Sequence, residues 1–250
     1  MSDKFVEHGD FYIACRADDI GRYVLLPGDP GRVPVIAQYL DGAEKVASNR
    51  EFTTYTGALL GEKVSVTSTG IGSPSAAIAV EELARMGAEV FIRVGTSGLM
   101  QRFMETGDLV IAWGAVRDEY TTQQYLPLAY PAVADMDVTL ALSQAAEQLG
   151  LKNFVGTVQS KDSFFGEHEP KRMPAGKRLL ERHDAWQKAG VLCSEMEAST
   201  IFVLSRMLGK RAGGVMVVGS SDQDLDNLIR TAIGSIEILI RQERQGEEKI

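Results

Sequence analysis

The 250-residue sequence contains little cysteine and little histidine, with two and three copies respectively. Cys15 and Cys193 lie far apart and show no metal-ligand spacing, and His168 and His183 are isolated in the same way. These absences exclude a cysteine-rich metal module and make a disulfide framework an unfavoured interpretation. The cysteine usage instead favours a reducing compartment such as the cytoplasm.

Excess positive charge and long apolar runs are also missing. The formal net charge is −8, from 26 Lys and Arg against 34 Asp and Glu. Phosphate backbones require clustered positive charge, so we expect no nucleic-acid partner. No segment reaches the length of a membrane span, and residues 1–7 have no apolar signal core. We therefore expect a soluble cytoplasmic protein without a membrane partner.

What the sequence does contain is an alternation of apolar runs and helical periodicity. Strand-like runs cover residues 23–26, 53–60, 63–69, 90–94, 109–112, 154–158 and 215–218, and helical segments cover residues 33–40, 73–87, 138–149, 179–189, 196–208 and 228–240. No repeat or linker divides them. We predict a single α/β domain over residues 1–250, with a mixed central β-sheet flanked by helices, and a polar functional loop over residues 161–177.

Three arginines are placed in or beside short glycine or threonine turns at the ends of apolar runs. Arg32 ends the run 24–32, Arg50 lies in the run 48–52, and Arg93 lies in the run 90–98. The planar guanidinium of arginine binds phosphate through two parallel hydrogen bonds, and backbone N–H groups of a glycine turn can complete the phosphate site. Three such segments predict a bound oxyanion. We expect the head group of Arg93 to serve this ligand rather than the core.

The turn Thr69-Gly70-Ile71-Gly72-Ser73-Pro74-Ser75 superficially resembles a dinucleotide-binding fingerprint. The third glycine position is Ser75, and no acidic residue follows a next strand at the required distance. A tight turn from strand to helix is the favoured interpretation, and the N-terminus of that helix could still attract an anion.

Two further segments allow both a structural and a functional interpretation. In Glu195-Met196-Glu197-Ala198 the acids either complement a helix N-terminus or bind the vicinal hydroxyls of a sugar. In the segment 161–172, Phe164 and Phe165 either form a stacking wall for a planar ligand or anchor a solvated loop. The residues alone leave both pairs of alternatives open.

Taken together, these segments resemble the nucleoside phosphorylases, and most closely their uridine phosphorylase branch. The resemblance covers nearly the whole chain and is carried by six motifs in order: PGDPGR at 27–32, REFT at 50–53, STGIGSPS at 68–75, RVGT at 93–96, YPAVAD at 130–135 and EMEA at 195–198. It implies one α/β domain that assembles as a hexamer, a trimer of dimers, in which each active site is completed by the neighbouring subunit.

The resemblance also implies the roles of individual residues. It implies that phosphate is held by Gly28, Arg32, Arg93 and Thr96, with Arg50 of a neighbouring chain. It implies that ribose is bound by Tyr12, Met196 and Glu197, and the base by Phe164, Glu167 and Arg172. It also implies that a monovalent cation, K⁺, is bound between subunits by Glu51, Ile71 and Ser75. Arg93 and Glu197 are the implied catalytic residues. No organic cofactor is implied, and phosphate is the co-substrate.

Three positions depart from the pattern of the branch. Glu167 stands where the branch has a Gln that both donates to a uracil carbonyl and accepts the N3 proton, whereas an ionised carboxylate only accepts. Arg172 could partly offset this loss. Tyr12 aligns with a His that reaches the ribose across the dimer, and His8 fits only with a shift. Asp222 resembles the Asp of the purine branch, in an imperfect register.

The expected reaction is the reversible phosphorolysis of a nucleoside, uridine foremost, to free base and ribose 1-phosphate. A purine or modified-nucleoside phosphorylase is the alternative, because Glu167 could accept from the adjacent N–H donors of guanine. A hydrolytic nucleosidase would leave the three arginines without a purpose. A homologue that binds a nucleoside without turning it over is the alternative from another class.

Overall fold

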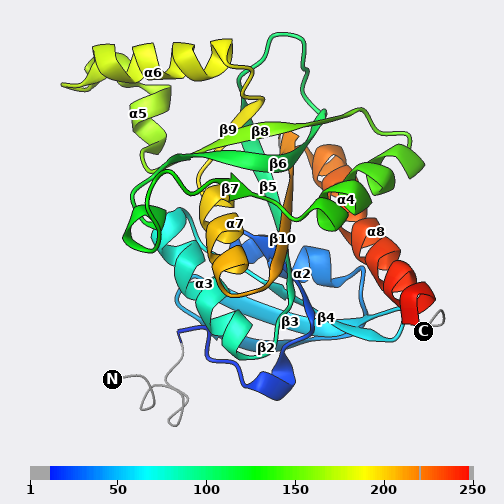
Figure 1. Cartoon of the computed structure of the whole chain (residues 1–250). Helices are drawn as coiled ribbons and strands as arrows, with labels where there is room; N and C mark the ends of the chain where they lie inside the picture. Colours follow the sequence, from blue (N-terminus) through cyan, green and yellow to red (C-terminus); the bar gives the residue numbers. More distant parts are fainter. Residues whose placement is uncertain (1–11, 220, 248–250) are drawn as a thin grey trace.

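The computed structural model of the chain describes residues 12–219 and 221–247, and within these ranges ten strands form one mixed sheet (Figure 1). The strands are β1 (Tyr23–Pro27), β2 (Asp41–Asn49), β3 (Phe52–Leu59), β4 (Glu62–Thr67), β5 (Val90–Leu99), β6 (Leu109–Asp118), β7 (Ala132–Val133), β8 (Asn153–Lys161), β9 (Cys193–Glu195) and β10 (Arg211–Val218). The helices are α2 (Val33–Ala37), α3 (Ser73–Arg85), α4 (Met136–Gln148), α5 (Phe164–His168), α6 (Gly176–Lys188), α7 (Ala198–Met207) and α8 (Asp222–Glu247). The single α/β domain with a mixed sheet flanked by helices is confirmed.

The sheet closes on itself around β5. In the strand order β10-β6-β8-β9-β5-β1-β4-β3-β2, β10 also pairs with β5, so β5, β10, β6, β8 and β9 form a ring. Within this ring the pairs β5–β10, β6–β8 and β8–β9 are parallel, and the pairs β10–β6 and β5–β9 are antiparallel; outside it, β1 pairs with β5 in parallel. β5 therefore has a paired strand on both edges from Val90 to Val94, and at least one paired strand along the rest of its length.

The core lies on both faces of this sheet because neighbouring strand residues point to opposite sides. Phe91 of β5 packs in one cluster with the buried residues of α3 and α7, whereas Ile92 packs in the other with α2, α4 and α8. Figure 1 shows α4 beside α8 on one side of the sheet and α3 beside α7 on the other. None of the helices within the described ranges is long and apolar enough to cross a membrane.

Local sequence signals explain the elements next to the glycine turn. Gly72 precedes α3 with φ of 89°, a left-handed conformation that glycine adopts readily, and Pro74 occupies the first helical turn. The predicted apolar face is buried, and the helix gives way to Gly87 at φ of 101°. The two runs at 53–60 and 63–69 form an antiparallel hairpin, β3 with β4, whose turn has Leu60 and Gly61 at positive φ.

The structure differs from the sequence-based expectation in several elements, including the following three. The edge strand β2 was not predicted, because two register shifts against β3 break its alternation and most of its residues are exposed or half-buried. Residues 161–177 are not one loop: β8 extends to Lys161, and α5 begins where Ser163 Oγ accepts from the Gly166 N–H at 3.0 Å. The helix expected at 196–208 begins at Ala198, after the short strand β9.

Gly213 of β10 lies directly against side chains of α4, and we predict that Gly213→Ala destabilises the fold. An added Cβ would lie 2.5 Å from Cγ1 of Val138 and 3.2 Å from Cδ1 of Leu142. Overpacking of this kind costs about 1–3 kcal/mol of the free energy of unfolding, a decrease in Tm of roughly 2–10 °C for a chain of this size. Gly246→Ala in α8 is the control, since nothing lies within 4 Å of that Cβ. Equal Tm values for wild type and Gly213→Ala would contradict the packing described.

Candidate functional site

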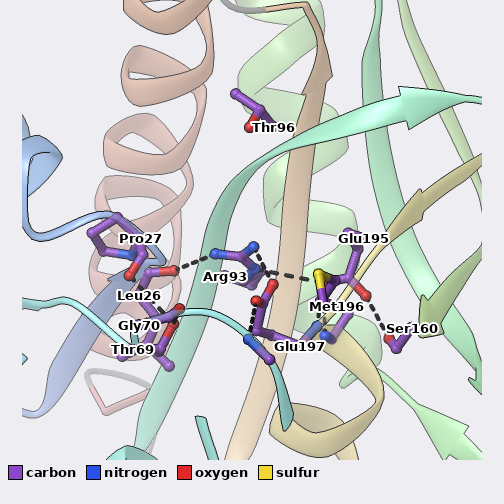
Figure 2. Close-up of polar contacts among 12 residues, drawn as sticks. Leu26, Pro27, Thr69, Gly70, Arg93, Thr96, Ser160, Glu195, Met196 and Glu197 are labelled. Atoms are coloured by element: carbon purple, nitrogen blue, oxygen red, sulfur yellow. Dashed lines mark hydrogen bonds and ion pairs between the residues drawn. The ribbon is translucent and has the colours of Figure 1, made fainter. Parts of the chain in front are cut away.

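Arg93 of β5 is the centre of a buried polar cluster, and only 5% of it is exposed. Its Nη2 donates to Oε2 of Glu197 and its Nη1 donates to the Leu26 carbonyl at 3.4 Å (Figure 2). Nε lies 3.6 Å from Oε2 of Glu195 and makes no hydrogen bond among the described residues. Arg93 was expected to serve the ligand rather than the core; its guanidinium also has a structural role, because it pairs with the buried carboxylate of Glu197 and lies beside that of Glu195.

Glu195 and Glu197 have different tasks at the start of α7. Oε2 of Glu195 accepts from the backbone N–H groups of Glu197 and Ala198 at 2.8 and 2.9 Å, and Oε1 accepts from Ser160. Glu195 thus caps the helix, which is the structural interpretation of this motif. Glu197 instead faces Arg93, and its Oε1 accepts from the Gly72 N–H at 2.6 Å.

The glycine turn is confirmed as a tight connection from β4 to α3, and it does attract an anion. Gly70 and Gly72 both adopt positive φ, at 69° and 89°, and this conformation turns the Gly72 N–H toward Glu197. The Thr69 N–H donates to the Pro27 carbonyl at 2.8 Å, which joins this turn to the loop after β1. The anion at the glycine turn is therefore a carboxylate of the protein.

Arg32 and Gly28 lie near Arg93, and Thr96 lies next to Arg32. Nη2 of Arg32 is 3.4 Å from Oγ1 of Thr96, and a Cβ on Gly28 would lie 3.4 Å from Nη1 of Arg93. Burial, and then the positive charge of Arg93, hold the pKa of the Arg32 guanidinium below its ordinary value. Two cations that disfavour each other's charge would both be stabilised by an oxyanion between them.

Arg50 and Tyr12 lie next to each other and outside the cluster around Arg93. Arg50 occupies the exposed turn between β2 and β3 with φ of 53°, and its guanidinium lies over the Tyr12 ring at 5.4 Å from the centroid. Among the described residues, neither side chain joins the hydrogen bonds around Arg93. His8, the alternative to Tyr12, lies outside the described residues.

Two of the three residues implied for a cation are in contact. Ser75 Oγ is within hydrogen-bond distance of Oε1 of Glu51, at 2.8 Å, and of the Thr69 carbonyl oxygen. Ile71, the third residue, is 79% exposed. Hydrogen bonds, first from its own backbone and then from Ser75, hold the pKa of Glu51 below its ordinary value. The described residues contain no cluster of three or more His, Cys, Asp or Glu side chains that could hold a metal ion.

Glu167 of α5 is held by residues that the sequence interpretation did not single out. Its Oε1 lies 3.3 Å from Nζ of Lys161, and its Oε2 accepts from Ser194 Oγ at 2.7 Å. Lys161 Nζ also donates to Ser194 Oγ at 2.6 Å, and Gln159 lies within 3.2 Å of the same hydroxyl. Gln159 and Lys161 are two residues apart on β8 and therefore lie on the same face, but the sequence pattern ended this strand at residue 158 and gave no signal for this pairing.

The remaining candidates are spread around α5. Phe164 is half-exposed and packs edge-on against Phe165 and 4.2 Å from the ring of His168. Arg172, which the resemblance assigns to the base, forms an exposed ion pair with Glu169 and lies over the Phe165 ring. The residue that compensates the charge of Glu167 is therefore Lys161 and not Arg172.

Two further residues complete the description of the candidates. Met196 is half-buried, and its carbonyl accepts from Ser73 Oγ at 3.1 Å. Asp222, which resembled the purine-branch acid, is the exposed first residue of α8. The structure thus brings together Gly28, Arg32, Arg93, Thr96 and Glu197, and separately Lys161, Glu167 and Ser194.

Comparison with known proteins identifies the relatives of this chain. Its residues 22–238 match the phosphorylase superfamily. The chain is similar to the uridine phosphorylase of Treponema pallidum, with 46% identity over 94% of this chain and 95% of the relative, and to that of Thermococcus kodakarensis, with 49% identity over 87% and 82%. It is also similar to the guanosine phosphorylase of Halorubrum lacusprofundi, with 44% identity over 80% and 78%.

We predict that Glu195 makes the stability of the protein fall as the pH rises. Burial, and then the charge of Glu197, raise the pKa of Glu195 above its ordinary 4.5 despite the opposing effect of Arg93. A folded-state pKa above the unfolded value stabilises the fold at low pH, and this contribution is lost as the pH rises through the raised pKa. Glu195→Gln keeps an oxygen for the two backbone N–H groups and removes the charge, so it should remove this decline.

The measurement is the free energy of unfolding against pH for wild type and Glu195→Gln. The variant should gain stability relative to wild type as the pH rises above 4.5, until the wild-type carboxyl is fully ionised. Glu44→Gln, at an exposed position of β2, is the matched control and should follow the wild-type profile. Parallel profiles for wild type and Glu195→Gln would show that the carboxyl does not titrate as described.

Proposed function

The chain belongs to the phosphorylase superfamily and is a nucleoside phosphorylase, a pentosyltransferase, and we propose that it catalyses the reversible phosphorolysis of uridine to uracil and ribose 1-phosphate. The observation that carries the proposal is the pair of guanidiniums of Arg32 and Arg93 next to the carboxylate of Glu197. This arrangement places an anion site directly beside an acceptor for sugar hydroxyls.

In the proposed phosphate site, Arg32 and Arg93 flank the anion and the Thr96 hydroxyl donates to it. Gly28 leaves room for the phosphate to approach, because a side chain there would contact the Arg93 guanidinium. Phosphate would also relieve the mutual repulsion that holds the pKa of Arg32 down. Arg50 would reach the anion from a second subunit, which its exposure and its distance from the Arg93 cluster support.

The proposed chemistry is a displacement at C1′ of the ribose. A phosphate oxygen forms a bond to C1′ while the glycosidic bond breaks, the sugar develops positive charge, and the base leaves with the electron pair. Glu197, with Met196 beside it, accepts from the ribose hydroxyls and stabilises the positive charge. Because Arg93 contacts Glu197, one guanidinium can position the nucleophile and the sugar together.

The base would lie against Phe164 and Glu167. A purine nucleoside such as guanosine is the second candidate substrate, supported by the 44% identity to a guanosine phosphorylase and by the ability of Glu167 to accept from N–H donors. A nucleoside panel assayed with and without phosphate decides between these proposals. Release of uracil from uridine only when phosphate is present supports the first, and preferential release of guanine supports the second. If no nucleoside releases its base in the presence of phosphate, the chain is a homologue that binds a nucleoside without turning it over.

The resemblance supports several finer proposals. The chain would act in the cytoplasm as a trimer of dimers, with Tyr12 of one subunit near the ribose of the next. Glu51, Ile71 and Ser75 would hold K⁺ between subunits; the oxygen donors of Glu51 and Ser75 suit a hard cation. Such an ion would supply positive charge that links two acidic surfaces, and it would take no part in the bond changes at C1′.

Arg32→Ala should weaken phosphate binding while the fold is retained. Apart from Thr96, Arg32 makes no side-chain hydrogen bond among the described residues, so its removal leaves no buried partner uncompensated. Loss of a charged hydrogen bond is worth roughly 1.5–3 kcal/mol, and we therefore expect kcat/KM for phosphate to fall roughly ten- to a hundredfold. Arg206→Ala, an exposed position at the end of α7, is the control. Unchanged phosphate kinetics in a folded Arg32→Ala variant would remove Arg32 from the site.

A further inference from the structure

A lysine buried at the end of β8 has no role in the function proposed so far. Only 6% of Lys161 is exposed. Lysines are almost never fully buried unless a partner neutralises them, because the charge loses its hydration. The partner is Glu167, whose Oε1 lies 3.3 Å from Nζ, and the side chains of both residues are largely shielded from solvent. The ion pair therefore has no net charge, and it places the ammonium donor of Lys161 next to the carboxylate acceptor of Glu167.

We propose that Lys161 and Glu167 together recognise the base, and that they select bases in which a ring N–H lies beside a carbonyl. The inference rests on the proposed function, since it assumes that a base reaches this end of the site. It changes the expectation for Glu167: the missing amide donor is supplied by the ammonium of Lys161, whereas Arg172 is engaged with Glu169.

The pair retains unused hydrogen-bonding capacity. Of the three N–H donors of Lys161, one is directed to Ser194 Oγ at 2.6 Å and one to Glu167, which leaves a third. Each carboxylate oxygen of Glu167 has one partner, Lys161 or Ser194, and each can accept a second hydrogen bond. A free donor and free acceptors thus remain next to each other on the same unit.

The pair borders a cavity and also lies near strand β5, which carries Thr96 of the proposed phosphate site. Lys161 and Glu167 line a cavity of about 520 Å³ that includes Gln159. Thr96, which contacts Arg32, and Gly98 are two residues apart on β5, so they lie on one face and roughly 7 Å apart. A Cβ on Gly98 would lie 3.8 Å from Oε1 of Glu167. Glu167 therefore lies next to the stretch of β5 that carries Thr96 of the proposed phosphate site, whereas the residues of that site do not line the 520 Å³ cavity.

The edges of the bases determine which of them this unit can bind. Uracil presents N3–H between two carbonyls, and hypoxanthine and guanine present N1–H beside C6=O, so the carboxylate can accept the N–H while the ammonium donates to the carbonyl. Cytosine and adenine present an unprotonated ring nitrogen beside an amino group, which reverses both polarities. The unit therefore accepts the first group and excludes the second, whether the ring is a pyrimidine or a purine.

The first test is kcat/KM for uridine, inosine, cytidine and adenosine with Lys161→Met, which keeps the length of the side chain and removes the donor. We expect the values for uridine and inosine to fall about ten- to a hundredfold relative to wild type, with an unchanged KM for phosphate. Lys171→Met, at an exposed position of the same segment, is the matched control and should behave as wild type. A folded Lys161→Met variant that keeps the wild-type ratio of uridine to cytidine would overturn the inference.

The second test needs no turnover and no variant. Calorimetry with the wild-type protein and phosphate should detect binding of uracil and hypoxanthine, and much weaker binding of cytosine, adenine and N3-methyluracil, which lacks the ring N–H. Equal affinities for uracil and N3-methyluracil would overturn the inference even if Lys161→Met failed to fold. If instead the bases bind as expected but no nucleoside is cleaved with phosphate, the proposed function fails and the recognition unit stands.

Discussion

The ion pair between Arg93 and Glu197 is the interaction on which the other parts of the site depend. It joins β5 to the start of α7, and through the Gly72 N–H it also fixes the turn before α3. Removal of one partner from such a buried pair leaves the other charge uncompensated, at about 3–5 kcal/mol. A substitution at Arg93 would therefore change fold and ligand binding together, whereas Arg32, with its single polar contact to Thr96, reports on the ligand alone.

The way in which Glu195 and Glu197 divide their tasks explains why the two interpretations of this motif could not be separated from the sequence. One acid caps a helix and the other faces an arginine from a strand 104 residues earlier. Both roles suit an acid at a helix start. Only the direction of each side chain distinguishes them, and β9, a strand of three residues, sets that direction.

Hydrophobic patterns and glycine positions predicted those elements whose structure is determined by the local sequence alone. The buried strands β1 and β5 and the helix α3 carry strong hydrophobic patterns, and the glycines around α3 mark its limits. β2 was missed because bulges break its alternation. Lys161 was missed because a lysine in a polar segment ordinarily projects into water, whereas here Glu167, six residues later, and Ser194, 33 residues later, hold its ammonium inside the protein. The motif resemblance assigned phosphate or ribose binding to five residues, and the structure places these residues near one another, as one shared site would require: Gly28, Arg32, Arg93, Thr96 and Glu197.

The ring of strands around β5 has a consequence for the energetics of ligand binding. Strand partners occupy β5 on both sides from Val90 to Val94, and β9 joins it again at Gly98 and Leu99. A strand held in this way cannot slide or twist to meet a ligand without breaking several ladders at once. The backbone beneath both proposed subsites is thus ordered before any ligand arrives. Association then loses little conformational entropy at these positions, and most of the entropic cost falls on the mobile ligand itself.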